Sequence, residues 1–192
     1  MIGIILASGY SKRMGTNKLL LSFKDKTIIE NIIEEVIYSK LEKVYIVCRE
    51  NEVKEIVGKY PIQIIINEMA HEGQSTSIVE AIKEVDNNFD SYMFLMGDQP
   101  LMNRDFINKM IDFYYSNNSS ILVPYYNGKR GTPVIFSSKW KNDLLKLKGD
   151  EGGRQIIRDN SEDVLEYKVE SEILGMDIDK AEDYERILNY IK

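Results

Sequence analysis

The sequence predicts an α/β fold: a three-layer α/β/α sandwich around a mostly parallel, Rossmann-like sheet, with a single domain over residues 1–192. Short apolar runs rich in β-branched residues alternate with segments in which apolar residues recur at helical spacing, the pattern of βαβ units. The opening run, 2–6, has no helical period and indicates a strand buried on both faces. A chain of 192 residues with ordinary apolar content suits one such domain.

The first half of the chain predicts four parallel strands. We expect strands at 2–6, 44–48, 62–66 and 92–96, and helices after Thr27, at 52–57, at 75–85 and at 103–115. Thr27 followed by Glu30 is typical of a capping box at a helix start. Because parallel crossovers are right-handed, the first three strands should lie in the order third, second, first, with the first strand central.

The second half predicts an antiparallel insertion. Two strand-like runs, 121–126 and 132–136, flank a turn at 127–131 and indicate a hairpin. A helix at 140–147, a strand at 164–169 and a closing helix follow.

Composition excludes several classes of protein. A net charge of −6 argues against general nucleic-acid binding. The single cysteine, Cys48, excludes an internal disulfide and a thiolate zinc site, and the single histidine, His71, excludes a histidine metal cluster. No apolar run is long enough to span a bilayer, and basic residues follow the first strand instead of preceding it, so we expect no signal peptide and a cytoplasmic protein.

The loop after the first strand predicts a phosphate site. It begins with small residues, Ala7-Ser8-Gly9, which let a flat ligand approach the backbone, and Gly9 and Gly15 permit turns that point N–H groups inward. Arg13 and Lys18 add two cations. The spacing fits neither G-x-x-x-x-G-K-[ST] nor G-x-G-x-x-G. A basic surface loop is the alternative.

Asp98 is the first candidate metal ligand, because it follows the 92–96 strand at the edge where α/β sheets bind ligands. Mg²⁺ prefers one or two carboxylates plus phosphate oxygens. An Asx-turn before Pro100 is the structural alternative.

Asp177 and Asp179 are candidates for a second carboxylate. Alternation would put both on one side of an extended strand, although Asp179 is better explained as a cap of the last helix.

Three polar segments carry weaker signals. Gln74, Ser75 and Ser77 present neutral groups that suit a base edge or a ribose, although Ser75 or Thr76 would equally suit an N-cap. Gly131, at the start of a strand, brings backbone near the predicted ligand crevice, and Arg154 follows a glycine-rich loop at 149–153.

The pattern L-A-x-G-x-S-x-R-M-G-x-x-K, from Leu6 to Lys18, resembles the signature loop of nucleotidyltransferases that consume a nucleoside triphosphate and release pyrophosphate. The chain looks most like the MobA-like NTP transferases, closest to the molybdenum cofactor cytidylyltransferases, on further motifs at 67–77, 97–101, 131–133, 149–154 and 177–179. The resemblance implies catalytic roles for Arg13, Lys18 and Asp98, and metal binding by Asp98 and Asp177. It implies nucleotide binding by Leu6, Ala7, Ser8, Gly9, Arg13, Lys18, Gln74, Ser75 and Asp98, and acceptor binding by Gly131 and Arg154.

The implied reaction transfers CMP from CTP to the phosphate of molybdenum cofactor, with Mg²⁺ as cofactor and a molybdoenzyme or its maturation chaperone as a further partner. Ser8 departs from the family pattern, since the guanylyl branch has Gly there and the cytidylyl branch Ala. Transfer to another phosphorylated small molecule, such as a sugar or polyol phosphate, and a non-catalytic cofactor-binding role are the alternatives.

Overall fold

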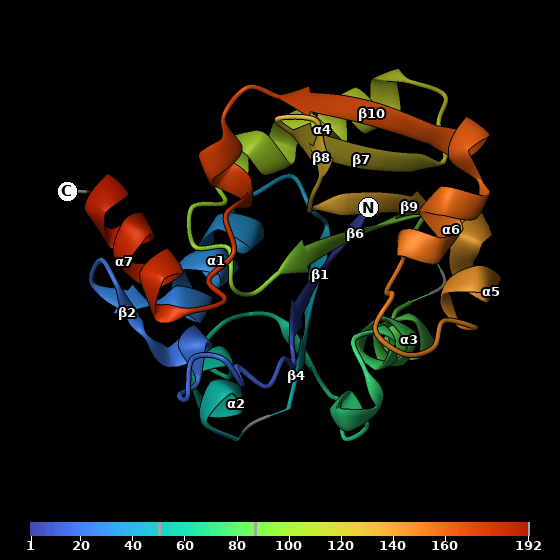
Figure 1. Ribbon diagram of the computed structural model, residues 1–192. Coiled ribbons are helices and arrows are strands. Elements are labelled where there is room, and N and C mark those ends of the chain that lie inside the picture. The colour runs from blue at the N-terminus through green and yellow to red at the C-terminus, as the bar shows by residue number, and fades with distance from the viewer. Residues whose placement is uncertain (50, 87, 192) are drawn as a thin grey trace.

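A computed structural model describes residues 1–49, 51–86 and 88–191, and an eight-stranded sheet lies at its centre (Figure 1). The strand order is β10-β7-β9-β6-β1-β4-β5, with the short β8 paired to β7. The strands of this sheet are β1 (Ile2–Ala7), β4 (Lys43–Cys48), β5 (Gln63–Ile66), β6 (Ser91–Met96), β7 (Ile121–Tyr126), β8 (Lys129–Arg130), β9 (Val134–Ser137) and β10 (Val164–Val169). A separate pair is formed by β2 (Ser22–Phe23) and β3 (Lys26–Thr27).

The sheet is parallel except where the hairpin enters it. β5, β4, β1 and β6 run parallel, so the predicted order with β1 central is confirmed. β9 pairs antiparallel with both β6 and β7, which confirms the predicted antiparallel insertion. β10 then pairs parallel with β7 at the edge. The carboxyl ends of β1 and β6 therefore lie side by side.

Helices cover both faces of the sheet, which confirms the three layers (Figure 1). One face packs against α1 (Ile28–Ile37), α2 (Asn51–Val57) and α4 (Arg104–Ser116). The other face packs against α3 (Ser75–Glu84), α5 (Lys141–Leu144) and α6 (Arg154–Asp159). A smaller core joins β2 to α7 (Ala181–Tyr190). Short 3₁₀ helices occur at Lys18–Leu20, Ala70–Glu72, Ser138–Trp140, Ser161–Asp163 and Glu172–Gly175.

The predicted capping box of α1 is present. The Glu30 amide donates to Thr27 Oγ1 at 3.4 Å, and the Thr27 amide donates to the Glu30 carboxylate at 2.9 Å. This backbone hydrogen bond, with one from the Thr27 hydroxyl, lowers the pKa of Glu30. Cys48 is a buried free thiol in β4, as expected of a core residue, and burial raises its pKa to about 11.

Three local predictions are wrong. The helix expected at 140–147 is a 3₁₀ turn followed by the four residues of α5, after which the chain turns back toward α3. Residues 176–180 form no strand: Ile178 donates one backbone hydrogen bond to Asp98 and has no ladder. Asp179 does not cap α7, because the Asp183 carboxylate accepts from the amides of Asp179 and Lys180.

Within the described residues, no helix combines the length and apolarity needed to cross a bilayer.

Candidate active site

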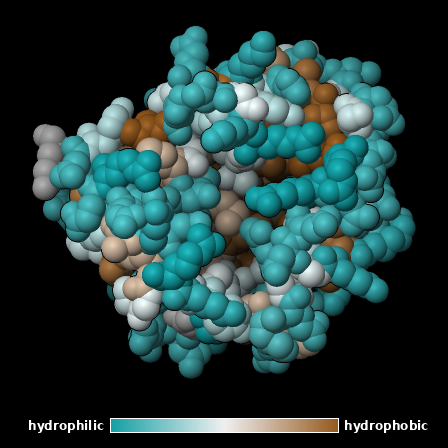
Figure 2. All heavy atoms as spheres, in the orientation of Figure 1, coloured by the Kyte–Doolittle hydropathy of each residue, from teal (hydrophilic) through white to brown (hydrophobic). Residues whose placement is uncertain are grey.

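Two adjoining cavities open at the carboxyl ends of β1 and β6. The first has a volume of about 450 Å³ and the second about 440 Å³, and Leu6 and Met96 line both. Figure 2 shows a hollow in the face viewed, with hydrophilic atoms around its rim. Ligands of α/β folds bind at this edge of the sheet.

Four of the charged side chains that line the second cavity form a cluster: Arg13, Lys18, Asp98 and Asp179. Lys18 Nζ donates to Asp98 Oδ2 at 2.5 Å and to Asp179 Oδ1 at 3.3 Å. Arg13 Nη1 donates to Asp179 Oδ2 at 2.9 Å. Burial lowers the pKa of Lys18, but attraction to Asp98 and Asp179, with their hydrogen bonds, outweighs burial and raises it above its ordinary value. Lys18 is therefore a fixed cation, and Arg13 and Asp179 are the more exposed partners.

Glycine at position 97 brings Asp98 close to β1. A Cβ at Gly97 would lie 3.2 Å from Ala7 Cβ and 3.2 Å from Ile29 Cδ1, a tight fit against two packed side chains. The Gly97 amide donates to the Leu6 carbonyl at 3.0 Å, which extends the pairing of β6 with β1 by one residue. Asp98 thus lies directly beyond the sheet, against the loop that carries Lys18.

The loop from Ser8 to Asn17 turns with positive φ at Ser11 (50°) and Gly15 (68°). Gly9, where we expected such a turn, does not have positive φ.

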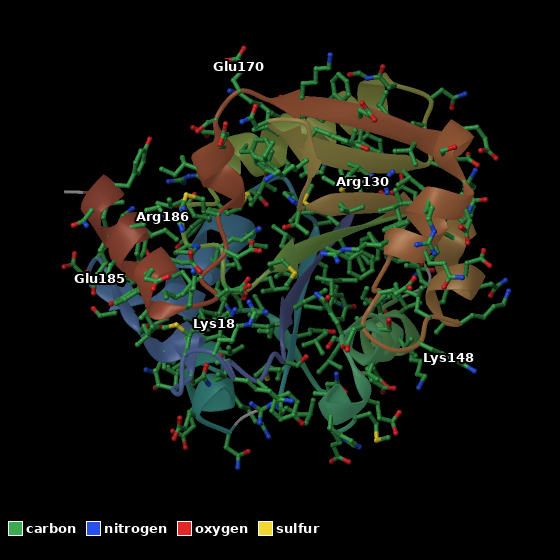
Figure 3. All side chains as sticks on the ribbon, viewed as in Figure 1. Lys18, Arg130, Lys148, Glu170, Glu185 and Arg186 are labelled. Carbon is green, nitrogen blue, oxygen red and sulfur yellow. The ribbon has the colours of Figure 1, made fainter. Side chains whose placement is uncertain are left out.

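Lys18 lies on the side of the molecule nearer α7, whereas Lys148 lies beside α3 (Figure 3).

The carboxylates fit a divalent cation. Asp98 Oδ1 is buried and has no hydrogen-bond partner among the described residues, whereas Oδ2 accepts from Lys18, so Oδ1 still has lone pairs free to bind a ligand. Asp177 accepts from Gln99 Nε2 at 2.6 Å, and Thr132 Oγ1 orients Gln99 by donating to its Oε1 at 2.8 Å.

Asp177 shares the electrostatic environment of Asp98. Burial among neighbouring groups and then repulsion from Asp98 raise the pKa of Asp177 to about 6, although part of its side chain is exposed. Within the described ranges no three Asp, Glu, His or Cys side chains are placed to hold an ion together. An ion bound here would take its remaining ligands from phosphate oxygens and water, as Mg²⁺ does.

The buried hydroxyls of Ser8 and Ser77 line the first cavity, and the buried Asn67, which lines neither cavity, bonds to Ser77. Ser8 Oγ lies 2.5 Å from Ser77 Oγ. Asn67 Nδ2 donates to Ser77 Oγ at 3.0 Å and to Thr76 Oγ1 at 2.9 Å. Ser8, Ser77 and Asn67 are all buried, so this network presents neutral donors and acceptors of fixed position.

Gln74 and Ser75, predicted together as ligand-binding, have different positions. Gln74 lines the first cavity. Ser75 is fully buried and lines neither cavity: its hydroxyl donates to the Lys148 carbonyl at 3.1 Å and accepts from the Gly152 amide at 3.2 Å. It fixes the 148–152 loop against α3, and neither Ser75 nor Thr76 serves as the N-cap of α3.

Leu6, Ala7, Ser8, Gly9, Arg13, Lys18, Gln74 and Asp98 each line at least one of the two cavities. Gly131 and Arg154 line neither cavity: Gly131 packs against the Tyr126 ring, and Arg154 is exposed at the start of α6. Asp177 also lies outside both linings.

Sequence reasoning missed several lining residues, namely Tyr10, Lys12, His71, Met96 and Asp150, and it favoured a helix cap over a ligand role for Asp179, which also lines the second cavity. Tyr10 stacks under the Arg49 guanidinium, 4.0 Å from ring centroid to guanidinium carbon. The sequence feature that could have indicated a ligand contact for Tyr10 is its position in the glycine loop after β1. For Asp150 the corresponding feature is its position next to Gly149.

A family model described as the MobA-like NTP transferase domain matches residues 3–164, which is most of the chain and includes every residue that lines the cavities except Asp179. The chain belongs to the MobA-like NTP transferase family. In this MobA-like transferase, the matched segment contains Lys18, Asp98 and the 148–152 loop, whereas Asp177 and Asp179 lie beyond it.

Three curated relatives of the MobA-like chain have different names. Purine catabolism protein PucB of Bacillus subtilis is 30% identical, and the match covers 97% of this chain and 95% of PucB. A probable molybdenum cofactor guanylyltransferase of Thermococcus sibiricus is 28% identical, over 76% of this chain and 65% of that protein. The molybdenum cofactor cytidylyltransferase of Escherichia coli is 26% identical, over 94% and 92%.

Solved structures share the fold. Rv0371c of Mycobacterium tuberculosis, in its manganese complex, superposes with a TM-score of 0.81 at 21% identity and covers 98% of this chain and 97% of that chain. A nucleotidyl transferase from Methanothermobacter superposes with a TM-score of 0.83 at 18% identity and covers 98% of this chain and 95% of that chain, so the mostly parallel Rossmann-like sheet is also the fold of a nucleotidyltransferase.

Proposed function

We propose that this MobA-like transferase moves CMP from CTP to the phosphate of molybdenum cofactor and releases pyrophosphate. The observation that carries the proposal is the buried pair of Lys18 and Asp98, with Asp98 Oδ1 unpartnered, beside a cavity lined by neutral hydrogen-bonding groups. The names of the Escherichia coli and Thermococcus sibiricus relatives support the class of reaction and acceptor.

The chemistry requires charge neutralisation more than a base. An oxygen of the acceptor phosphate attacks the α-phosphorus of CTP, and the bond between that phosphorus and the oxygen bridging to the β-phosphorus breaks. A phosphate monoester is already a nucleophile near neutral pH, so no protein group has to remove a proton. Lys18 and Arg13, which line the second cavity, would bind the triphosphate and stabilise the charge that accumulates on the leaving pyrophosphate.

The Lys18 ammonium group is also preorganised for this role in the absence of nucleotide. This group is held by Asp98 and Asp179, so little reorganisation is needed when phosphate oxygens replace part of that contact.

Asp98 and Asp177 would hold a divalent cation, for which we propose Mg²⁺. Such an ion supplies positive charge at the phosphates during the transfer. The unpartnered Asp98 Oδ1 supports this assignment, as does the manganese complex of Rv0371c.

CTP is proposed as the donor because Ser8 narrows the first cavity. Its side chain is buried and lies against Ser77, in the position where the guanylyl branch has Gly. A pyrimidine needs less room than a purine, and the hydroxyl and amide groups of Ser8, Ser77 and Gln74 match the edge of a base.

Pyrophosphate release tests the proposal. Purified protein is given Mg²⁺, molybdenum cofactor and one of CTP, GTP, ATP or UTP. We expect release with CTP and little with the others. Release with GTP alone would contradict the assignment of the base, and release with CTP only when a sugar or polyol phosphate replaces the cofactor would contradict the acceptor.

Binding of CTP and cofactor without any release would instead support a carrier role. A molybdoenzyme or its maturation chaperone as partner, and a cytoplasmic location, stay predictions from the sequence.

A further inference from the structure

Asp150 lies where the two cavities meet. Among the described residues it is the one acidic side chain that lines both, whereas Ser8 and Ser77 line only the first, and Lys18 and Asp98 only the second. A nucleoside triphosphate has its sugar between base and phosphates. A side chain at the junction of a cavity suited to the base and a cavity suited to the phosphates therefore faces the sugar.

The Asp150 carboxylate is held in place by the 73–75 segment. The main-chain amide of Gln74 donates to Asp150 Oδ1 at 3.1 Å, and the main-chain amide of Ser75 donates to the Gly149 carbonyl at 2.9 Å. Gly73 makes this approach possible, since a Cβ there would lie 2.5 Å from the Gly149 carbonyl and 2.9 Å from Asp150 Oδ1. Asp150 is exposed at the cavity mouth, but one of its carboxylate oxygens is held by a main-chain hydrogen bond from Gln74.

The second oxygen of Asp150 is available. Across residues 1–49, 51–86 and 88–191, the group that donates to this carboxylate is the main-chain amide of Gln74, and it donates to Oδ1. Oδ2 is left to accept from a ligand. A carboxylate repels phosphate but accepts strong hydrogen bonds from hydroxyl groups.

We propose that Asp150 accepts a hydrogen bond from a hydroxyl of the nucleotide ribose and makes this site select ribonucleotides over deoxyribonucleotides. The inference rests on the proposed function, because it requires a nucleoside triphosphate to lie across both cavities. It assigns the acid of the 149–154 loop to the nucleotide, whereas Arg154 of the same loop lies outside both cavities.

Calorimetric binding of CTP, 2′-deoxy-CTP and 3′-deoxy-CTP tests the inference. We expect the wild-type protein to bind CTP about tenfold or more tightly than at least one deoxy analogue, as one charge-assisted hydrogen bond provides. Asp150→Ala should weaken CTP binding by a similar factor and leave that analogue unchanged. Asp150→Asn keeps an acceptor for the Gln74 amide and should show the same loss of discrimination with the loop intact.

Glu151→Gln is the matched control. Glu151 is the adjacent acid of the loop, lines neither cavity and pairs with Arg158 at 3.5 Å, so this variant should keep the preference for CTP. Equal binding of CTP and both analogues by the wild-type protein would overturn the inference. So would an Asp150→Ala variant that weakens all three equally, since that pattern belongs to a loop-holding role alone. A folded wild-type protein that binds none of the four nucleoside triphosphates would overturn the proposed function itself, and the inference with it.

Discussion

Lys18 and Asp98 hold opposite charges where water reaches little of either side chain, with exposed fractions of 11% and 12%. Each is acceptable there because the other is present, since an unpaired buried charge is costly. Asp177 and Asp179 add further negative charge nearby, so Lys18 compensates more than one carboxylate.

Removing Lys18 alone should therefore destabilise the fold as well as the reaction. Lys18→Ala is expected to lower the free energy of unfolding by about 3 kcal/mol, because it leaves Asp98 charged, buried and unpaired. The double variant Lys18→Ala/Asp98→Ala should recover part of that loss. Urea denaturation of both variants and the wild type measures the difference. A Lys18→Ala protein as stable as wild type would contradict the buried pair.

The sequence around each residue predicted which residues belong to this cluster better than it predicted which of them contact one another. Arg13, Lys18 and Asp98 were expected at one site because each follows a strand end or lies in the glycine loop. Asp179 was interpreted as a helix cap, and its contacts with Arg13 and Lys18 join residues 166 and 161 positions apart. Sequence spacing carries no information on such a pairing until the path of the chain back to the sheet is known.

At the scale of elements, α1 is positioned by its capping box. The helix starts directly after the β2–β3 pair and packs Ile29 against Gly97, so its start influences where Asp98 lies. Thr27→Ala should cost about 1 kcal/mol of stability.

Glu30 should make that stability depend on pH. Its pKa is lowered in the folded protein, so its contribution is fully present above its ordinary value of 4.5 and is lost as the pH falls through the folded value. The difference in unfolding free energy between wild type and Glu30→Ala should stay constant from neutral pH down to the ordinary value of 4.5 and shrink as the pH falls further. A difference that stays constant below that value as well would show that the Glu30 charge contributes nothing.

The contact between the 148–152 loop and the segment before α3 depends on Gly73. Gly73 has a φ of 121° and Gly149 a φ of 65°, but a Cβ meets close atoms only at position 73. Gly149→Ala should cost about 1 kcal/mol from backbone strain alone. Gly73→Ala should cost more and also weaken CTP binding, since the loop that carries Asp150 has to move. Chemical denaturation and calorimetry of the two variants test this, and equal effects on both measurements would contradict the packing.

Helices with strong local signals were predicted well, and weak ones were not. The N-caps of α1 and α4 are Thr27 and Asn103, whose side chains accept from the main-chain amides of Glu30 and Phe106. The segment 176–180 alternates like a strand, and the Ile178 amide donates to the Asp98 carbonyl, but no strand among the described residues pairs with it. A strand requires a partner, and whether one is available is a property of the whole fold.

At the scale of the whole molecule, the site results from the strand order. Right-handed crossovers place β1 between β4 and β6, so the ends of β1 and β6 adjoin and bring the glycine loop to Asp98. This much was predictable from the sequence. The attachment of the 148–152 loop to α3 was not, because it depends on single hydrogen bonds from Ser75 and on one glycine.

Asp98→Asn tests the central claim most directly. Asparagine keeps the shape of the side chain and an acceptor for Lys18, which also stays paired with Asp179, so the fold should persist while the negative charge proposed to bind the metal is lost. Pyrophosphate release from CTP with Mg²⁺ and molybdenum cofactor should fall about 100-fold or more. Asp112→Asn, which changes an exposed acid on α4 paired with Lys40, should release pyrophosphate at the wild-type rate. An Asp98→Asn protein with undiminished release would contradict catalysis by this cluster.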